Sequence, residues 1–76
     1  MDKETVEEAI NKIVREAQDF QENPTYLLAL ELDKDISILR YMIGEENFLT
    51  MHYFRMVHEQ AVKLIDEHIK QQEKKQ

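Results

Sequence analysis

The side chains of this 76-residue chain that are best able to do chemistry are three histidines and sixteen acidic residues. The histidines are His52, His58 and His68, which are six and ten residues apart. Metal ligands on one helix need a spacing of three or four residues, and the Glu-x-x-His pair typical of a di-iron helical bundle does not occur. The sequence therefore predicts no metal site and no cofactor. We interpret His58 and His68 as residues at the edge of the core that hydrogen-bond to a neighbour. The alternative is a pH-sensitive interface, whose affinity would fall as the pH drops through about 6.5.

Nucleophilic and phosphate-binding motifs do not occur either. The chain has no cysteine, and its only glycine is Gly44, so it has neither a glycine-rich elbow around a serine nor a phosphate-binding loop. Glu31 and Asp35 are four residues apart, but such pairs on helices are usually solvated charges. We therefore expect no catalytic residues and no enzymatic activity.

One segment, residues 28–34 (LALELDK), resembles the second helix of the small aspartyl-phosphate phosphatases of spore-forming bacteria, the Spo0E-like family. Residues 31–33 match the Glu-Leu-Asp part of that family's Ser-Gln-Glu-Leu-Asp motif, whereas Ala29 and Leu30 replace the Ser and the Gln. The resemblance implies an antiparallel helical hairpin. It also implies a degenerate phosphatase that removes phosphate from a receiver domain and depends on Asp33.

The charge of the chain is negative and unevenly distributed. The net charge is −6, and residues 1–35 carry all of it, with ten acids against four bases. An acidic half repels phosphate backbones, so nucleic acid is not an expected partner. It could instead cover a basic protein surface, as an inhibitor or antitoxin-like protein does.

The chain has no features of a membrane protein or a secreted one. It contains no apolar run near the ~20 residues that span a bilayer, and the segment 1–4 lacks the basic start of a signal peptide. A membrane-surface helix would need a basic polar face, which the acidic first helix lacks. We expect a cytoplasmic protein that does not bind membranes.

Apolar periodicity predicts three helices, at about residues 3–22, 24–43 and 46–71, followed by a frayed tail at 72–76. Asn23-Pro24 is a favoured helix start, and Gly44 a favoured helix end. Because the connections are short, the helices should be antiparallel neighbours. The predicted fold is all-α: a single domain over residues 1–76 that forms a small antiparallel three-helix bundle, completed by dimerisation.

A second apolar face supports that last expectation. On the second helix, four large apolar residues and Lys34 lie roughly opposite the main stripe, and the third helix repeats the pattern more weakly. Exposed apolar patches mark interfaces, and small domains gain stability from twofold pairing. The predicted interface residues are Leu27, Leu30, Ile38, Tyr41, Leu49, Tyr53 and Met56. We therefore expect a non-enzymatic, homodimeric interaction or regulatory module that can also bind another protein, by analogy a bacterial or phage accessory protein.

Overall fold

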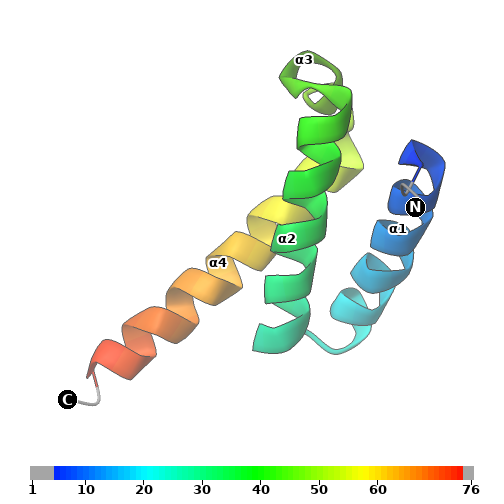
Figure 1. Cartoon of the computed structure of the whole chain (residues 1–76). Helices are drawn as coiled ribbons and strands as arrows, with labels where there is room; N and C mark the ends of the chain where they lie inside the picture. Colours follow the sequence, from blue (N-terminus) through cyan, green and yellow to red (C-terminus); the bar gives the residue numbers. More distant parts are fainter. Residues whose placement is uncertain (1–4, 75–76) are drawn as a thin grey trace.

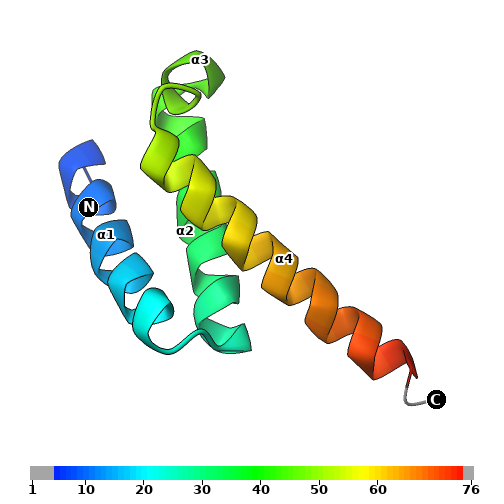
Figure 2. The same cartoon turned by 180° about the vertical axis from the view of Figure 1, so that it is seen from behind.

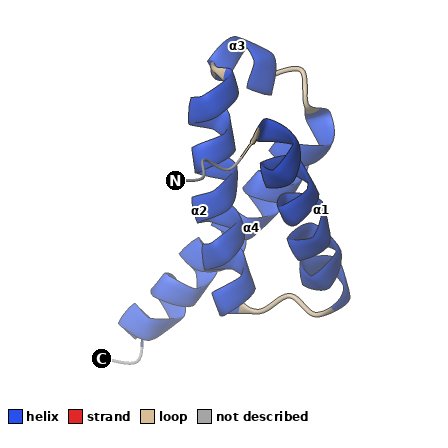
Figure 3. Ribbon diagram, turned by 45° about the vertical axis from the view of Figure 1, so that its right-hand side comes forward, coloured by secondary structure: helices blue, strands red, loops and turns tan. Residues whose placement is uncertain are grey.

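The computed structural model describes residues 5–74, and its regular elements there are all helices (Figure 3). They are α1 (Val6–Glu22), α2 (Tyr26–Ile43), α3 (Glu45–Phe48) and α4 (His52–Lys74). The all-α expectation is confirmed, with four helices in these residues instead of three. None of the described helices has both the length and the apolarity needed to cross a membrane.

The first helix starts later than the apolar pattern indicated, at Val6 and not near Lys3. The reason is a capping box at Thr5, whose backbone is extended. The Thr5 hydroxyl accepts a hydrogen bond from the Glu8 backbone N–H at 3.1 Å, and the Glu8 carboxylate accepts one from the Thr5 N–H, also at 3.1 Å. These bonds satisfy donors that have no partner within the helix. Residues 3 and 4 lie outside the described part.

The second helix is capped by Thr25, not by Asn23 as the Asn-Pro pair suggested. The Thr25 hydroxyl accepts a hydrogen bond from the Leu28 N–H at 3.1 Å. Asn23 instead ends α1, donating its backbone N–H to the Asp19 carbonyl at 2.9 Å. Thr25 also has a good capping side chain, and it defines the start of α2 two residues after Pro24.

The third predicted helix is interrupted. Gly44, with φ 90°, ends α2, and a single turn, α3, follows before the chain turns again at residues 49–51. The Thr50 hydroxyl and backbone N–H both bond to the Asn47 carbonyl, at 2.7 and 3.1 Å, which closes this turn. The turn places Phe48 in the core with 2% of its surface exposed.

The end of α4 also differs from the sequence-based expectation, because the helix continues through residues 72–74, where a frayed tail was expected. Residues 75 and 76 lie outside the described part.

The central element is α2, which packs against both α1 and α4. The chain runs down α1 and back along α2, and α4 then crosses α2 at an angle, with its C-terminal half extending away from the α1–α2 pair (Figures 1 and 2). The buried apolar core lies between these helices. Its members are Ala9, Ile13, Ala17, Phe20, Ala29, Leu32, Ile36, Leu39, Phe48, Phe54, Val57 and Ala61.

Candidate functional site

The outward side of α2 carries a row of large apolar side chains. At 100° per residue they lie opposite the buried Leu32, Ile36 and Leu39. Lys34, which is also exposed, lies in the middle of the row. The apolar members have the following exposed fractions: Leu27 73%, Leu30 38%, Ile38 47% and Tyr41 90%.

This outward side of α2 is not covered by another helix of the described chain. In Figure 1, α2 lies in front, with α1 beside it and α4 crossing behind it, and in Figure 2 α4 lies in front. Both partners of α2 therefore occupy its other sides. A large apolar row left in water is unfavourable, so this row is the most conspicuous candidate for a binding surface.

The other three predicted interface residues are exposed but do not extend this row. Leu49, Tyr53 and Met56 are each 44–45% exposed. Met56 lies on the side of α4 away from the buried Val57 and Ala61, which face the core, so it points away from α2. The seven residues are thus divided between α2 and the α3–α4 region.

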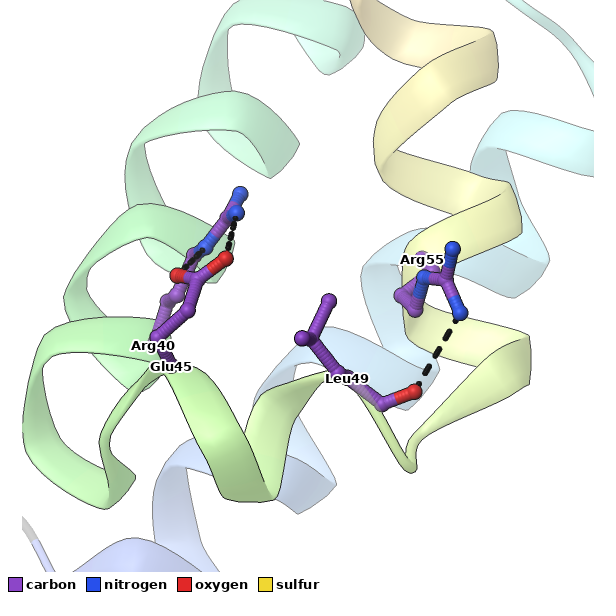
Figure 4. Close-up of polar contacts among 4 residues, drawn as sticks. All are labelled: Arg40, Glu45, Leu49 and Arg55. Carbon is purple, nitrogen blue, oxygen red and sulfur yellow. Dashed lines mark hydrogen bonds and ion pairs between the residues drawn. The ribbon is translucent and has the colours of Figure 1, made fainter.

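Leu49 and Met56 are seven residues apart but do not share a helix face, because Leu49 lies between α3 and α4. The chain turns at residues 49–51, and the Leu49 carbonyl accepts a hydrogen bond from Arg55 Nη1 at 3.2 Å (Figure 4). At the start of α3, Arg40 makes a bidentate ion pair with Glu45. Its Nε and Nη2 donate to the two carboxylate oxygens at 2.6 and 2.5 Å. The pairing lowers the pKa of Glu45, mainly through its hydrogen bond with Arg40. These two contacts hold the α2–α3–α4 corner.

A second candidate is a cluster of three carboxylates between α1 and α2. Glu16, Glu31 and Asp35 each bring one oxygen within 4.8 Å of the others. Asp35 is buried, with 7% of its surface exposed. Its Oδ2 lies 3.6 Å from the Lys12 ammonium, which is an ion pair but too long for a hydrogen bond. Lys12 is thus paired with the buried member of the cluster.

The crowding of negative charge changes the protonation of Glu16. Burial, a side-chain hydrogen bond to Asp35 and repulsion by Asp35 raise the pKa of Glu16 to about 7, and the nearby Lys12 only partly opposes them. The sequence identified the Glu31–Asp35 pair but not Glu16. The available signal was that Glu16 is next to Ala17 at the edge of the apolar stripe of α1, where a polar side chain turns toward α2.

The residue that the phosphatase resemblance singles out, Asp33, is held by a histidine from α4. Asp33 Oδ1 and His58 Nε2 are 2.7 Å apart, and this hydrogen bond connects α2 to α4. The prediction that His58 is hydrogen-bonded at the edge of the core is confirmed. His68 is likewise partly buried, but the contact found there is a stacked ring, with Tyr26 at 3.9 Å between centroids.

Comparison with family models, curated proteins and solved structures finds no match to this chain. Its function is therefore inferred from its own residues.

Proposed function

We propose that this chain is a non-enzymatic interaction module that forms a homodimer through the outward row of α2. The single observation that supports the proposal is the set of four large apolar side chains exposed on one side of the central helix. Twofold dimers are the commonest assembly of soluble proteins, and each copy brings the same row to the contact.

The energetics favour pairing of moderate strength. Fully burying one Leu, Ile or aromatic side chain contributes about 1.5–3 kcal/mol. Four such residues from each of two copies, already partly buried, contribute about 7–15 kcal/mol in proportion to their exposed fractions. A micromolar dissociation constant corresponds to a surplus of about 8 kcal/mol, which this gain supplies when the cost of association lies at the low end of the estimated ~4–15 kcal/mol. We therefore expect a dissociation constant near the micromolar range and not an extremely tight dimer.

Pairing would also reinforce a small fold. A domain of this length buries only a modest core and commonly needs reinforcement. In the proposed assembly α1, α2 and α4 act as an antiparallel three-helix bundle that the second copy completes.

The test is solution mass by light scattering, with a matched pair of variants. Ile38→Glu places a charge in the proposed interface, and Val62→Glu places one at an equally exposed β-branched residue on α4 (47% and 45% exposed). We expect the parent and Val62→Glu to be dimeric, and Ile38→Glu to be a folded monomer. A monomeric parent at about 100 µM, well above the expected dissociation constant, would contradict the proposal. So would a dimer that Ile38→Glu leaves intact.

A second candidate is an acidic inhibitor of a basic protein. Its support is the exposed acids near the two ends of α1: Glu7, Glu8, Asp19 and Glu22. Charge-driven binding weakens steeply with added salt, whereas apolar pairing does not. Retention of a captured partner in high salt would therefore argue against this candidate.

A further inference from the structure

The outward row of α2 reads the same from both ends. Its members are Leu27, Leu30, Lys34, Ile38 and Tyr41, so the steps between them are three, four, four and three residues. Lys34 is the midpoint. On either side of it lies an inner apolar residue, then an outer one.

The exposure of the row has the same symmetry. The two outer residues, Leu27 and Tyr41, are the most exposed, at 73% and 90%, and the two inner ones, Leu30 and Ile38, are less so, at 38% and 47%. Glu31 and Ser37, both exposed and each three residues from Lys34, give the row a polar residue on each flank. The apolar character, spacing and exposure of the row are thus symmetric about Lys34.

We propose that two copies pair through α2 in antiparallel orientation, with the twofold axis passing beside Lys34; this inference rests on the proposed homodimer. A twofold axis perpendicular to α2 reverses the direction of the helix, so each half of the row meets the other half of its copy, and matching halves place apolar residues against apolar ones. The axis brings Leu27 of one copy to the level of Tyr41 of the other, and Leu30 to the level of Ile38. A parallel dimer requires no such correspondence, so the mirror symmetry of the row favours the antiparallel one.

The axis brings the two Lys34 ammonium groups to the same level, where an acid of the opposite copy offsets their repulsion. Lys34 of one copy lies within three residues of Glu31 of the other, roughly 4.5 Å along the helix axis, which a lysine side chain spans easily. Glu31 belongs to the carboxylate cluster with Glu16 and Asp35, where Lys12 pairs with Asp35. The second copy therefore supplies a cation to a region with excess negative charge. Antiparallel helices also place opposite ends of their dipoles together.

Disulfide cross-linking tests the orientation directly, because the natural chain has no cysteine. Packed helices have axes about 8–10 Å apart, so facing Cα atoms come within the ~4.4–6.8 Å that a disulfide needs. The variants are Leu27→Cys, Lys34→Cys and Tyr41→Cys, each oxidised alone. Leu27→Cys is also oxidised mixed with Tyr41→Cys, and the products are identified by mass spectrometry. Lys63→Cys, exposed on α4, is the control.

In the antiparallel dimer two copies of Lys34→Cys form a disulfide with each other. The mixture of Leu27→Cys and Tyr41→Cys should give at least tenfold more disulfide-linked mixed dimer than either variant gives of its own linked dimer. Lys63→Cys should link only at the background level. Self-linking of both outer variants, without a preference for the mixed product, would overturn the antiparallel arrangement. If light scattering still finds a dimer, that result leaves the proposed homodimer intact. A monomeric parent would instead remove the proposed function itself, and with it this inference.

Discussion

The carboxylate cluster between α1 and α2 leads to a prediction about stability, which Glu16→Gln tests. Glu16, Glu31 and Asp35 bring oxygens within 4.8 Å of each other, and the pKa of Glu16 is raised to about 7. Above pH 7 Glu16 loses its proton and adds a negative charge to the cluster, and Lys12 lies at ion-pair distance from Asp35. Glutamine has nearly the same shape, carries no charge and offers N–H donors to the Asp35 carboxylate.

The direction of the effect follows from proton binding. In the unfolded chain Glu16 titrates near its ordinary value of 4.5, and in the folded chain near 7. Between these values the folded state holds more protons, so the free energy of unfolding falls as the pH rises through this window and is level above it. If the whole rise in the pKa of Glu16 counted at ~1.4 kcal/mol per pKa unit, the free energy of unfolding would fall by roughly 3 kcal/mol. Because Glu16 is only partly buried and is screened by solvent, we expect about 1–2 kcal/mol.

The assay is urea unfolding followed by circular dichroism at pH 5 and pH 8, at one fixed protein concentration, because dimerisation makes stability depend on concentration. At pH 8 we expect the parent to be about 1–2 kcal/mol less stable than Glu16→Gln. The stability that the parent loses between pH 5 and pH 8 should be smaller by the same amount in the variant. Glu59→Gln, which removes an exposed acid from α4, should keep the parent's pH dependence. The reasoning is refuted if Glu16→Gln leaves that dependence unchanged.

Two further predictions concern the corner between α2 and α4. Phe48→Ala should destabilise the fold by about 3–5 kcal/mol, because Phe48 is almost fully buried and its removal leaves a cavity. If urea unfolding finds a loss of stability below about 1 kcal/mol, α3 does not contribute to the core. Gly44→Ala should cost about 1–3 kcal/mol, since φ 90° and ψ 151° is a conformation that alanine rarely adopts, although open space surrounds the new methyl group. Thermal unfolding measures this change, and an unchanged midpoint would contradict the strain.

Periodicity was sufficient to predict the long helices and most of the core. The buried residues Ile13, Leu32 and Ile36 all lie on the apolar stripes that the spacing identifies. Such stripes depend on residues three and four apart, so they can be read along the chain without knowing the fold. The exposed row on α2 could be predicted for the same reason, since it lies opposite one of these stripes.

The ends of helices and the α3 turn could not be predicted, because they depend on competition between neighbouring groups. Thr25 and Asn23 are both good capping residues, and only the three-dimensional arrangement shows that Thr25 is used for α2 while Asn23 ends α1. Phe48 was missed because it ends a single helical turn, which is too short to form an apolar stripe. The Phe48 ring lies against the Arg40 guanidinium, whose central carbon is 4.8 Å from the ring centroid, and it meets the His58 ring edge-on. Both contacts come from tertiary structure.

The carboxylate cluster needed tertiary structure for a different reason, since Glu16 comes from α1 while Glu31 and Asp35 come from α2. Glu31 also flanks the proposed dimer row, so the two features are coupled. In the antiparallel pair, Lys34 of the second copy approaches Glu31 and favours the ionised cluster. By thermodynamic reciprocity, ionisation of the cluster favours pairing. In the proposed pair, the same negative charge that weakens a single chain above pH 7 would therefore strengthen its attraction for a second one.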